Sequence, residues 1–288
     1  MVNICVNQNW TCDERRSRLF KGDILQYSSN KATVALAQHA IKLISIALAP
    51  FPPEKAQFDL SVNEFIGIIG PLKSKFTNDL VTKYLIQDVL RSFGCDLNKT
   101  YFDVPRLRIV PADGYLSSGV SYAYKAHRDT WYSSPLAQIN WWMPVFAIVP
   151  ERAMSFYPEY WNKNISNSSS CFDYEEWCAV GRQQAATQVN EDARKHPLPL
   201  ETVSDVSELR IAASMGDLTL FSAAHLHATV PNNSGLTRFS IDFRTVFEDD
   251  LLKGNGAPDV DNASTGTTLI DYLRASDLSA INKSFLGN

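Results

Sequence analysis

The spacing of hydrophobic residues divides this chain into two parts. Residues 31–48 are rich in Ala, Leu and Ile and end at the proline-rich stretch 50–53, which predicts a helix that stops there. A second helix is predicted after Asn78, a residue that can cap it, and its apolar positions follow helical spacing up to Gly94. We therefore expect residues 1–104 to be mainly helical.

Beyond residue 104, polar and apolar residues alternate, which is typical of half-buried strands. The alternation runs through residues 106–109 and 138–143 and is strictest at 238–244, where the polar side chains share one face. One helix is expected near 173–188, inside an insert at about 156–200. Helices followed by many short strands indicate an α+β fold, in which the strands form an antiparallel barrel or sandwich with the helices packed outside.

Length and composition are those of one soluble globular unit. The chain has 288 residues, 45% of them hydrophobic and 20% charged, with a mean hydropathy of −0.17. We expect a single domain over 1–288, with a barrel core at 105–247 and a C-terminal tail at 248–288, because barrels of about 200–250 residues fold as one domain. The formal net charge is −4, without the basic excess of nucleic-acid-binding proteins, so nucleic acid is not an expected partner.

Cysteine usage and the N-terminal sequence predict a cytoplasmic protein. The five cysteines have irregular spacing and include no CxxC pair, so we expect reduced thiols and neither a disulfide framework nor a thiolate zinc site. Residues 1–15 lack the apolar stretch of a signal peptide, and the apolar segment 40–49 is shorter than the ~20 residues that cross a membrane. A membrane is therefore not an expected partner either.

Two short motifs among the predicted strands carry side chains that bind metals. His127 and Asp129 are two positions apart, so on a strand both point to the same side, although a lone His-x-Asp triplet occurs by chance in many proteins. A second segment supplies His227, followed by Arg238 and Ser240. Two histidines and one carboxylate on one face of an ion are the ligand set of non-haem Fe(II) oxygenases. An arginine can hold a carboxylate through two parallel hydrogen bonds.

With these motifs the sequence resembles the Fe(II)/2-oxoglutarate-dependent dioxygenases, in particular their phytanoyl-CoA dioxygenase-like branch. The matching elements lie between residues 105 and 247 and are His127-x-Asp129, the Gly216-Asp217 turn, His227 and Arg238-x-Ser240. The resemblance implies a double-stranded β-helix, a jelly-roll or cupin-like barrel with flanking helices. It also implies that Fe(II) is bound by His127, Asp129 and His227. 2-Oxoglutarate would be bound by Arg238 together with Ser240, and O2 would be the oxidant.

The resemblance also separates two neighbouring histidines. His225 and His227 lie two positions apart, so strand periodicity alone does not choose between them. The family's segment continues from the metal-binding histidine with Asn and Ser, and His227 with Asn232 and Ser234 fits that frame. This leaves His225 as a packed histidine or one behind the ligands. Related halogenases carry Gly or Ala where this chain has Asp129, so the resemblance implies a hydroxylase.

Further residues are candidates for the walls of the site. Gln138 and Asn140 share one face of a predicted strand and can hydrogen-bond 2-oxoglutarate, with ordinary packing inside the barrel as the alternative. Aromatic rings can stack on planar substrates, and arginines can bind anions, although aromatic residues are more often core and arginines on one strand face can form a solvated edge. The candidate substrate contacts are Trp131, Tyr124, Arg106 and Trp142, with Arg108 and Arg128 as further possible anion contacts.

A longer string, residues 126–132 together with 138–142, is similar to a subgroup of small-molecule hydroxylases in the same superfamily. That similarity implies a small-molecule natural product as the partner of this protein. The favoured substrate is 7-deoxycylindrospermopsin, a toxin precursor, and a Kdo-type sugar is the alternative. Two other classes stay open. One is a cupin-like protein that binds metal without turnover, which would not need the arginine clamp, and the other is a structural barrel with buried histidines.

Overall fold

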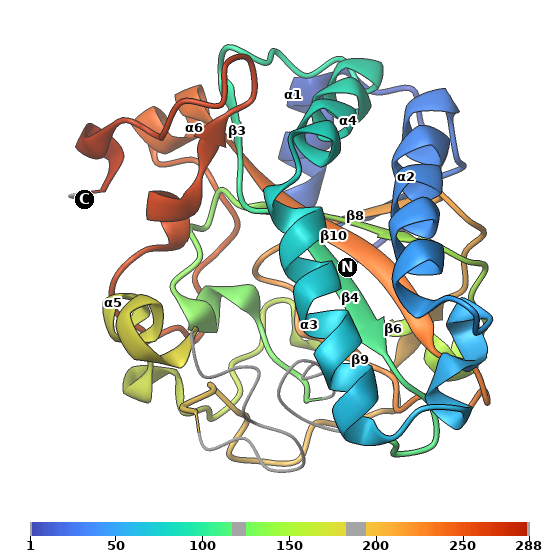
Figure 1. The fold of residues 1–288 in the computed structure, drawn as a ribbon. Helices are drawn as coiled ribbons and strands as arrows, with labels where there is room; N and C mark the ends of the chain where they lie inside the picture. The colour runs from blue at the N-terminus through green and yellow to red at the C-terminus, as the bar shows by residue number, and fades with distance from the viewer. Residues whose placement is uncertain (1, 117–124, 183–193, 287–288) are drawn as a thin grey trace.

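The structure is a computed structural model that describes residues 2–116, 125–182 and 194–286 (Figure 1). Within these residues the strands form two sheets. The larger sheet has eight strands, in the order β1 (Ile4–Val6), β2 (Ile24–Tyr27), β8 (Leu218–Ser222), β5 (Ile139–Pro144), β10 (Arg238–Phe247), β3 (Thr100–Phe102) and β11 (Leu273–Arg274), with β4 (Arg106–Val110) also paired to β10. The smaller sheet has the order β7 (Leu209–Ile211), β6 (Met154–Phe156) and β9 (His227–Thr229).

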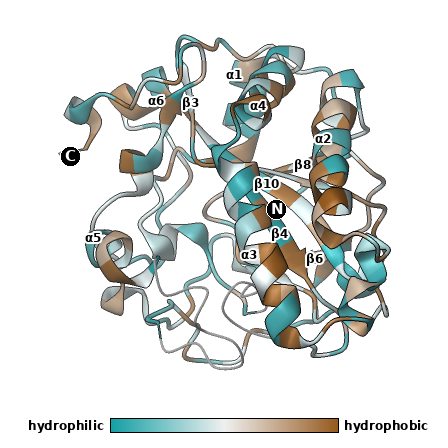
Figure 2. Ribbon diagram, viewed as in Figure 1, coloured by the Kyte–Doolittle hydropathy of each residue, from teal (hydrophilic) through white to brown (hydrophobic). Residues whose placement is uncertain are grey.

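Helices cover one face of the larger sheet. In Figure 1, α2 (Lys31–Leu48), α3 (Val62–Asn78) and α4 (Leu80–Ser92) lie in front of the strands. Their buried side chains form one hydrophobic core with the sheet, to which Ile44, Phe76 and Phe243 belong. Figure 2 shows the corresponding pattern, because α2 and α3 each carry a hydrophobic and a hydrophilic side. The shorter helices are α1 (Cys12–Leu19), α5 (Tyr174–Glu176) and α6 (Glu248–Lys253).

One helical stretch, Lys31–Phe58, is long and apolar enough to cross a membrane by length and composition alone. Its first part is α2, in which Leu36, Ala40 and Ile44 are fully buried in the hydrophobic core. Packing of that side against the sheet accounts for the apolar composition.

The long strand β10 separates the core from the space between the two sheets. Its residues Phe239, Ile241 and Phe243 pack into the helix-covered core, and the polar residues between them face the other way. A second hydrophobic cluster, with Trp142 of β5 and Phe156 of β6 among its members, joins that other face to the smaller sheet. The alternation predicted for 238–244 is confirmed, and it directs a row of polar side chains between the sheets.

Four elements agree with the sequence-based predictions: the helix α2 and the strands β4, β5 and β10. The mixed helix and strand content also agrees with the predicted α+β class. The expectation that residues 1–104 are mainly helical is incomplete, because β1, β2 and β3 from this part join the larger sheet. These strands have three or four residues each, too few for an alternating pattern to be recognised. The C-terminal tail likewise adds β11, which pairs with β3.

Two helix boundaries differ from the predictions. Asn78 does not cap the second predicted helix, since it is the last residue of α3. The cap of α4 is Asp79, whose carboxylate accepts a hydrogen bond from the backbone of Val81 at 3.0 Å. Of the helix expected at 173–188, the structure contains α5 and one π-helical turn, Trp177–Gly181, while residues 183–193 lie outside the described part of the chain.

Candidate metal centre and its cavity

Three side chains from two chain segments meet between the sheets. His127 and His227 form an antiparallel bridge through two backbone hydrogen bonds of 2.9 and 3.0 Å. Asp129 lies at the start of a short 3-10 helix directly after this bridge. Its Oδ1 atom is 3.6 Å from Nε2 of His127 and 4.0 Å from Nε2 of His227. One ligand atom from each of the three residues lies within 4.8 Å of the other two, so the group can hold a metal ion.

The backbone fixes which nitrogen each histidine offers. Nδ1 of His127 lies 2.9 Å from the carbonyl oxygen of Lys125, and Nδ1 of His227 lies 3.0 Å from that of His225. A carbonyl oxygen only accepts hydrogen bonds, so each Nδ1 carries a proton and each Nε2 is the nitrogen that faces Asp129. Burial, together with the neighbouring His127, lowers the pKa of His227 to about 3, which keeps its ring neutral as a metal ligand must be.

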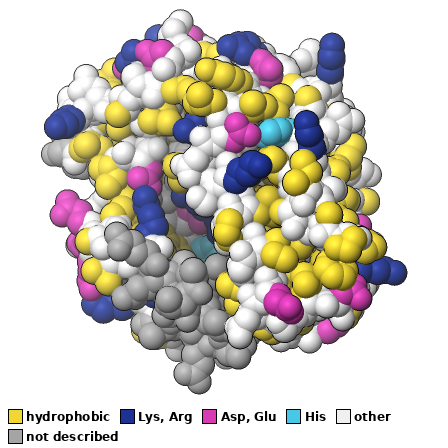
Figure 3. Space-filling model, in the orientation of Figure 1, with side chains coloured by type: hydrophobic (Ala, Val, Ile, Leu, Met, Phe, Trp, Pro, Cys, Tyr) yellow, Lys and Arg dark blue, Asp and Glu magenta, His cyan; other side chains and the backbone are white. Residues whose placement is uncertain are grey.

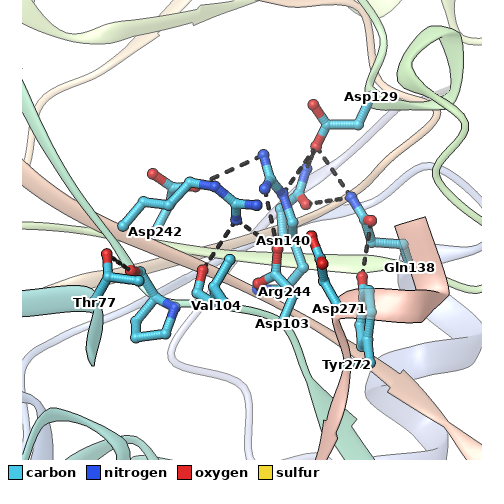
Figure 4. Close-up of polar contacts among 12 residues, drawn as sticks. Thr77, Asp103, Val104, Asp129, Gln138, Asn140, Asp242, Arg244, Asp271 and Tyr272 are labelled. Atoms are coloured by element: carbon cyan, nitrogen blue, oxygen red, sulfur yellow. Dashed lines mark hydrogen bonds and ion pairs between the residues drawn. The ribbon is translucent and has the colours of Figure 1, made fainter. Parts of the chain in front are cut away.

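Neighbouring side chains hold the carboxylate of Asp129 through one of its oxygens, so the other oxygen is available to a metal ion (Figure 4). Oδ2 accepts hydrogen bonds from Asn140 at 2.7 Å and Gln138 at 3.1 Å. Gln138 also donates to the amide oxygen of Asn140 at 2.9 Å and accepts from the hydroxyl of Tyr272 at 2.9 Å. These contacts fix the plane of the carboxylate, so that Oδ1 is directed at the two histidines.

Arg244 supplies the positive charge behind this carboxylate. Its Nε lies 3.7 Å from Oδ2 of Asp129, and its Nη atoms lie 3.1 Å from Asp103 and 3.7 Å from Asp242. Burial opposes ionisation of Asp129, but the guanidinium of Arg244 together with His127 and His227 outweighs it, and these groups hold the pKa of that carboxyl well below its usual range. Asp129 is therefore an anion at neutral pH.

The charges continue along the cavity wall in alternating sign. Arg108 holds Asp242 through two hydrogen bonds, of 2.6 and 3.2 Å, in a bidentate pair. Burial raises the pKa of Asp242, yet Arg108 and Arg244 together lower it to about 2. Arg106 is bound by Asp103 and by the carbonyl oxygen of Val104.

Gln138 and Asn140 have a role that the sequence did not indicate. Both were expected to contact 2-oxoglutarate, and in the structure their amide groups hold the candidate metal ligand Asp129. Both also line the cavity, so the predicted contact with 2-oxoglutarate stays a prediction.

The predicted clamp for a carboxylate lies on β10 beside the smaller sheet. Arg238 is only 3% exposed, and it donates to the carbonyl oxygen of Ala153 at 3.1 Å and to the hydroxyl of Thr229 at 3.3 Å. Thr229 is two positions after His227 on β9, so this contact joins the guanidinium to the strand that carries a candidate metal ligand. Ser240 follows on the same face, and its hydroxyl is buried without a hydrogen-bond partner among the described residues.

A cavity of about 560 Å³ opens over the three candidate ligands, a size typical of small-molecule sites. Figure 3 shows the surface hollowed beside the residues drawn in grey, with charged and histidine side chains in the hollow. Charges of both signs line it: Arg106, Arg108, Arg182, Arg194, Arg238 and Arg244 with Asp103, Asp129, Asp242 and Asp271. Tyr132, Phe172, Trp177 and Trp142 add aromatic surface.

The predicted substrate contacts divide in the structure. Arg106 and Trp142 line the cavity, whereas Tyr124 lies outside the described residues. Trp131 is fully buried in a separate hydrophobic cluster and donates to Asp261 at 2.7 Å, so the structure corrects its expected role from substrate contact to packing. Arg128, considered for anion binding, is also buried, and it holds Asp261 and three backbone carbonyl oxygens.

His225 is not one of the three candidate metal ligands, in agreement with the sequence pattern that selected His227. Its Nε2 lies 2.9 Å from the carbonyl oxygen of Gly22, and its ring packs against Trp161 at a centroid distance of 4.5 Å. Burial lowers its pKa to about 4, so this ring is a neutral packing residue. Asn232 and Ser234 shape the turn before β10, where the Asn232 amide accepts from Ser234 at 2.7 Å.

Comparisons with known proteins find solved structures that align with this chain at low sequence identity. No protein-family model and no curated protein matches the sequence. The chain aligns with EvdO2 from Micromonospora carbonacea var. aurantiaca, solved with 2-oxoglutarate, at 10% identity and a TM-score of 0.38, over 60% of this chain and 62% of EvdO2. It aligns with the non-haem monooxygenase ThoJ at 12% identity and a TM-score of 0.42, over 88% and 80% of the chains. It aligns with SnoN, a non-haem α-ketoglutarate-dependent epimerase from nogalamycin biosynthesis, at 10% identity and a TM-score of 0.40, over 81% of this chain and 82% of SnoN.

Proposed function

We propose that this protein is a non-haem Fe(II)- and 2-oxoglutarate-dependent oxygenase that hydroxylates a small molecule in the cytoplasm. The observation that carries the proposal is the group formed by His127, Asp129 and His227 at the base of the cavity. Two imidazole nitrogens and one carboxylate oxygen converge there, each already oriented by a hydrogen bond behind it. This donor set suits Fe(II) and leaves positions on the ion for other ligands.

The residues around the ligands fit 2-oxoglutarate as the co-substrate. Arg238 offers a buried guanidinium, and Ser240 offers a buried hydroxyl that has no partner among the described residues. A buried polar group without a partner costs free energy, which a bound carboxylate would recover. When bound, Fe(II) and 2-oxoglutarate would supply the activation of O2.

The protein's own part is to orient the candidate metal ligands and to shield them from bulk water. Asn140, Gln138 and Arg244 hold Asp129 so that one oxygen faces the histidines. Phe221 and Trp142 cover the base of the cavity with apolar surface and keep bulk water away from the ligands. Because the carboxylate position is filled by Asp129 and not by a small residue, we propose hydroxylation and not halogenation.

For the fold we propose a double-stranded β-helix within a single domain over residues 1–288. The support is the presence of a larger and a smaller sheet joined by a hydrophobic cluster, with His227 on the smaller sheet and Arg238 on the larger one. Strands from both ends of the chain enter the larger sheet, which suits one folding unit.

For the substrate we propose a natural product, with 7-deoxycylindrospermopsin as the favoured compound. It is a zwitterion with a guanidinium, a sulfate and a uracil ring, and the cavity offers carboxylates, arginines and aromatic rings. A Kdo-type sugar, which lacks the uracil ring and the guanidinium, is the alternative. Incubation with each compound and measurement of succinate together with a 16-dalton mass gain would separate them.

The test of the oxygenase proposal is anaerobic addition of Fe(II) and then 2-oxoglutarate, followed by absorption spectroscopy. A metal-to-ligand charge-transfer band is expected for the unaltered protein and its loss is expected for His127→Ala. His39→Ala is the matched control, because His39 lies on α2, with its Nε2 3.1 Å from a carboxylate oxygen of Asp79, and does not line the cavity, so this variant is expected to keep the band. Absence of a band and of succinate formation in the unaltered protein would refute the proposal.

A protein that binds metal without turnover is one alternative, and a structural barrel with buried histidines, which would bind no Fe(II), is the other. The first would take up Fe(II) but would show neither a band with 2-oxoglutarate nor succinate. The buried Arg238 on the cavity wall favours the enzyme, since storage of a metal ion does not need a carboxylate clamp.

A further inference from the structure

Two cysteines from distant parts of the chain meet on the face of the larger sheet opposite the cavity. Cys12 is the first residue of α1, Cys95 follows α4, and their sulfur atoms lie 3.7 Å apart. Both residues are half-buried, so the pair is not sealed from solvent. They line a small cavity of about 20 Å³ together with Trp141 and Thr245 of the underlying strands.

The surroundings favour a thiolate on Cys12. Arg16 donates to its sulfur at 3.2 Å and is itself fixed by an ion pair of 2.6 Å with Asp250. The sulfur also lies in the first turn of a helix, where the helix dipole favours negative charge. The hydrogen bond with Cys95, followed by the charges of Arg16 and Arg15, lowers the pKa of Cys12 to about 6 against the effect of burial.

The second cysteine is suited to complete a reaction that the first begins. The hydrogen bond with Cys12 and burial raise the pKa of Cys95 well above its usual value, so it stays a thiol beside the Cys12 thiolate. Its backbone N–H is fixed by the carbonyl oxygen of Leu90 at 3.0 Å, which keeps the sulfur in place at the end of α4. A low-pKa thiolate next to a second thiol is the arrangement of a redox-active pair.

We propose that Cys12 and Cys95 form a reversible disulfide, with hydrogen peroxide as the oxidant. The Cys12 thiolate attacks the peroxide, an S–O bond forms, the O–O bond breaks, and the released hydroxide takes up a proton to become water. The sulfur of Cys95 then attacks the oxidised sulfur, the S–S bond forms, the S–O bond breaks, and the leaving hydroxide takes the proton of Cys95 as a second water. Two electrons pass from the two thiols to one peroxide, and a dithiol reductant reverses the change.

The bond would link α1 to the segment after α4 and close a loop between residues 83 positions apart in sequence. A disulfide across a loop of that length restricts the unfolded chain, so the oxidised form is expected to melt roughly 5–15 °C above the reduced form. This inference is independent of the proposed function, because the pair lies on the other face of the sheet.

The experiment uses the metal-free full-length protein with a small excess of hydrogen peroxide, followed by blocking of free thiols and proteolysis without reduction. We expect a linked peptide pair containing Cys12 and Cys95, loss of two of the five thiols, and recovery of both with dithiothreitol. Cys95→Ser is expected to leave a sulfenic acid on Cys12 that reacts with dimedone. Cys171→Ser, which changes an exposed cysteine, is the matched control and is expected to form the same link.

A second measurement does not depend on oxidation. Iodoacetamide at pH 7 is expected to label Cys12 roughly fivefold faster than Cys5, because the larger thiolate fraction outweighs the lower nucleophilicity of a low-pKa thiolate. The proposal is overturned if no peptide linking Cys12 to Cys95 forms. It is also overturned if the thiol loss maps to other cysteines, or if Cys12→Ser and Cys12→Ala, both folded by circular dichroism, still lose two thiols.

Discussion

Replacement of Asn140 by leucine tests whether the amides behind Asp129 prepare it for a metal ion. The side chains of Asn and Leu have nearly the same shape, so the change removes little packing. It removes the hydrogen bond that Asn140 accepts from Gln138 and the one that it donates to Asp129. That bond is the shortest one to Oδ2 of Asp129, at 2.7 Å, and its loss leaves Gln138 and Arg244 as the remaining contacts of this oxygen. The carboxylate would then be free to turn about its Cβ–Cγ bond.

The size of the effect follows from the kind of bond that is lost. A hydrogen bond to a charged group contributes about 1.5–3 kcal/mol to stability, which for a chain of this size corresponds to a fall in Tm of roughly 3–10 °C. Residues that hold a metal ligand typically change metal affinity by about 10–100-fold. A donor to Oδ2 also withdraws charge from Oδ1, and this opposing effect is smaller than the gain from orientation. We therefore expect Asn140→Leu to bind Fe(II) or Co(II) at least tenfold more weakly.

The assay is an anaerobic titration with Co(II), read from its visible absorption, together with thermal unfolding of the metal-free protein. The matched control is Thr245→Val, which removes a hydrogen bond of 2.9 Å from Trp141 on the opposite face of the same strand pair. This variant is expected to lose stability and keep its metal affinity. Unchanged or tighter metal binding in Asn140→Leu, or an equal loss in Thr245→Val, would refute the reasoning.

Three further predictions concern the cavity and its wall. Arg238→Ala is expected to raise the KM for 2-oxoglutarate far more than it weakens Fe(II) binding, and steady-state kinetics with a parallel metal titration would show an equal loss of both if the assigned role is wrong. Asp129→Gly is expected to lose most of its metal affinity and to regain part of it with chloride but not with nitrate, measured by Co(II) titration, since Asn140 and Arg244 would face the vacated space. Burial and Arg108 lower the pKa of Lys73 to about 7 from 10.5, so the unfolded chain binds the proton of this side chain more tightly than the folded protein does. The free energy of unfolding therefore rises as the pH increases from 7 to 10.5. Lys73→Met is expected to abolish that rise in urea unfolding at pH 7 and pH 10, and an unchanged rise would contradict it.

The three candidate metal ligands could be predicted from the sequence because they depend on local spacing. His127 and Asp129 are two positions apart, although Asp129 begins a 3-10 helix and does not lie on the predicted strand. His227 is followed by its own pattern of Asn and Ser, so neither motif needed knowledge of the fold. Trp131 was misjudged for the same reason, since closeness to His127 in sequence was taken as closeness to the cavity. The indole instead turns into a cluster closed by Asp261, a residue about 130 positions away, and no local pattern reports such a contact.

The order of the strands in the sheets could not be predicted from the sequence pattern. The strand β2 joins the larger sheet beside β8, almost two hundred positions later in the chain, through three residue pairs. A segment of four residues has no periodicity that distinguishes it from a loop, and its pairing is decided by tertiary packing. By contrast, the ten residues of β10 alternate long enough for both of its faces to be assigned in advance.

The position of Arg244 depends on both the alternation along β10 and the pairing of β10 with β5. Alternation along β10 places Arg244 on the same face as Arg238, and this much the sequence predicted. Pairing with β5 sets Arg244 directly opposite Asn140, and this register brings the guanidinium to the far oxygen of Asp129. One strand thus carries both the clamp expected for a carboxylate ligand and the counter-charge of a metal ligand. A slip of β10 by one residue would turn both arginines into the hydrophobic core, so the register of a single strand pair fixes the electrostatics of the whole site.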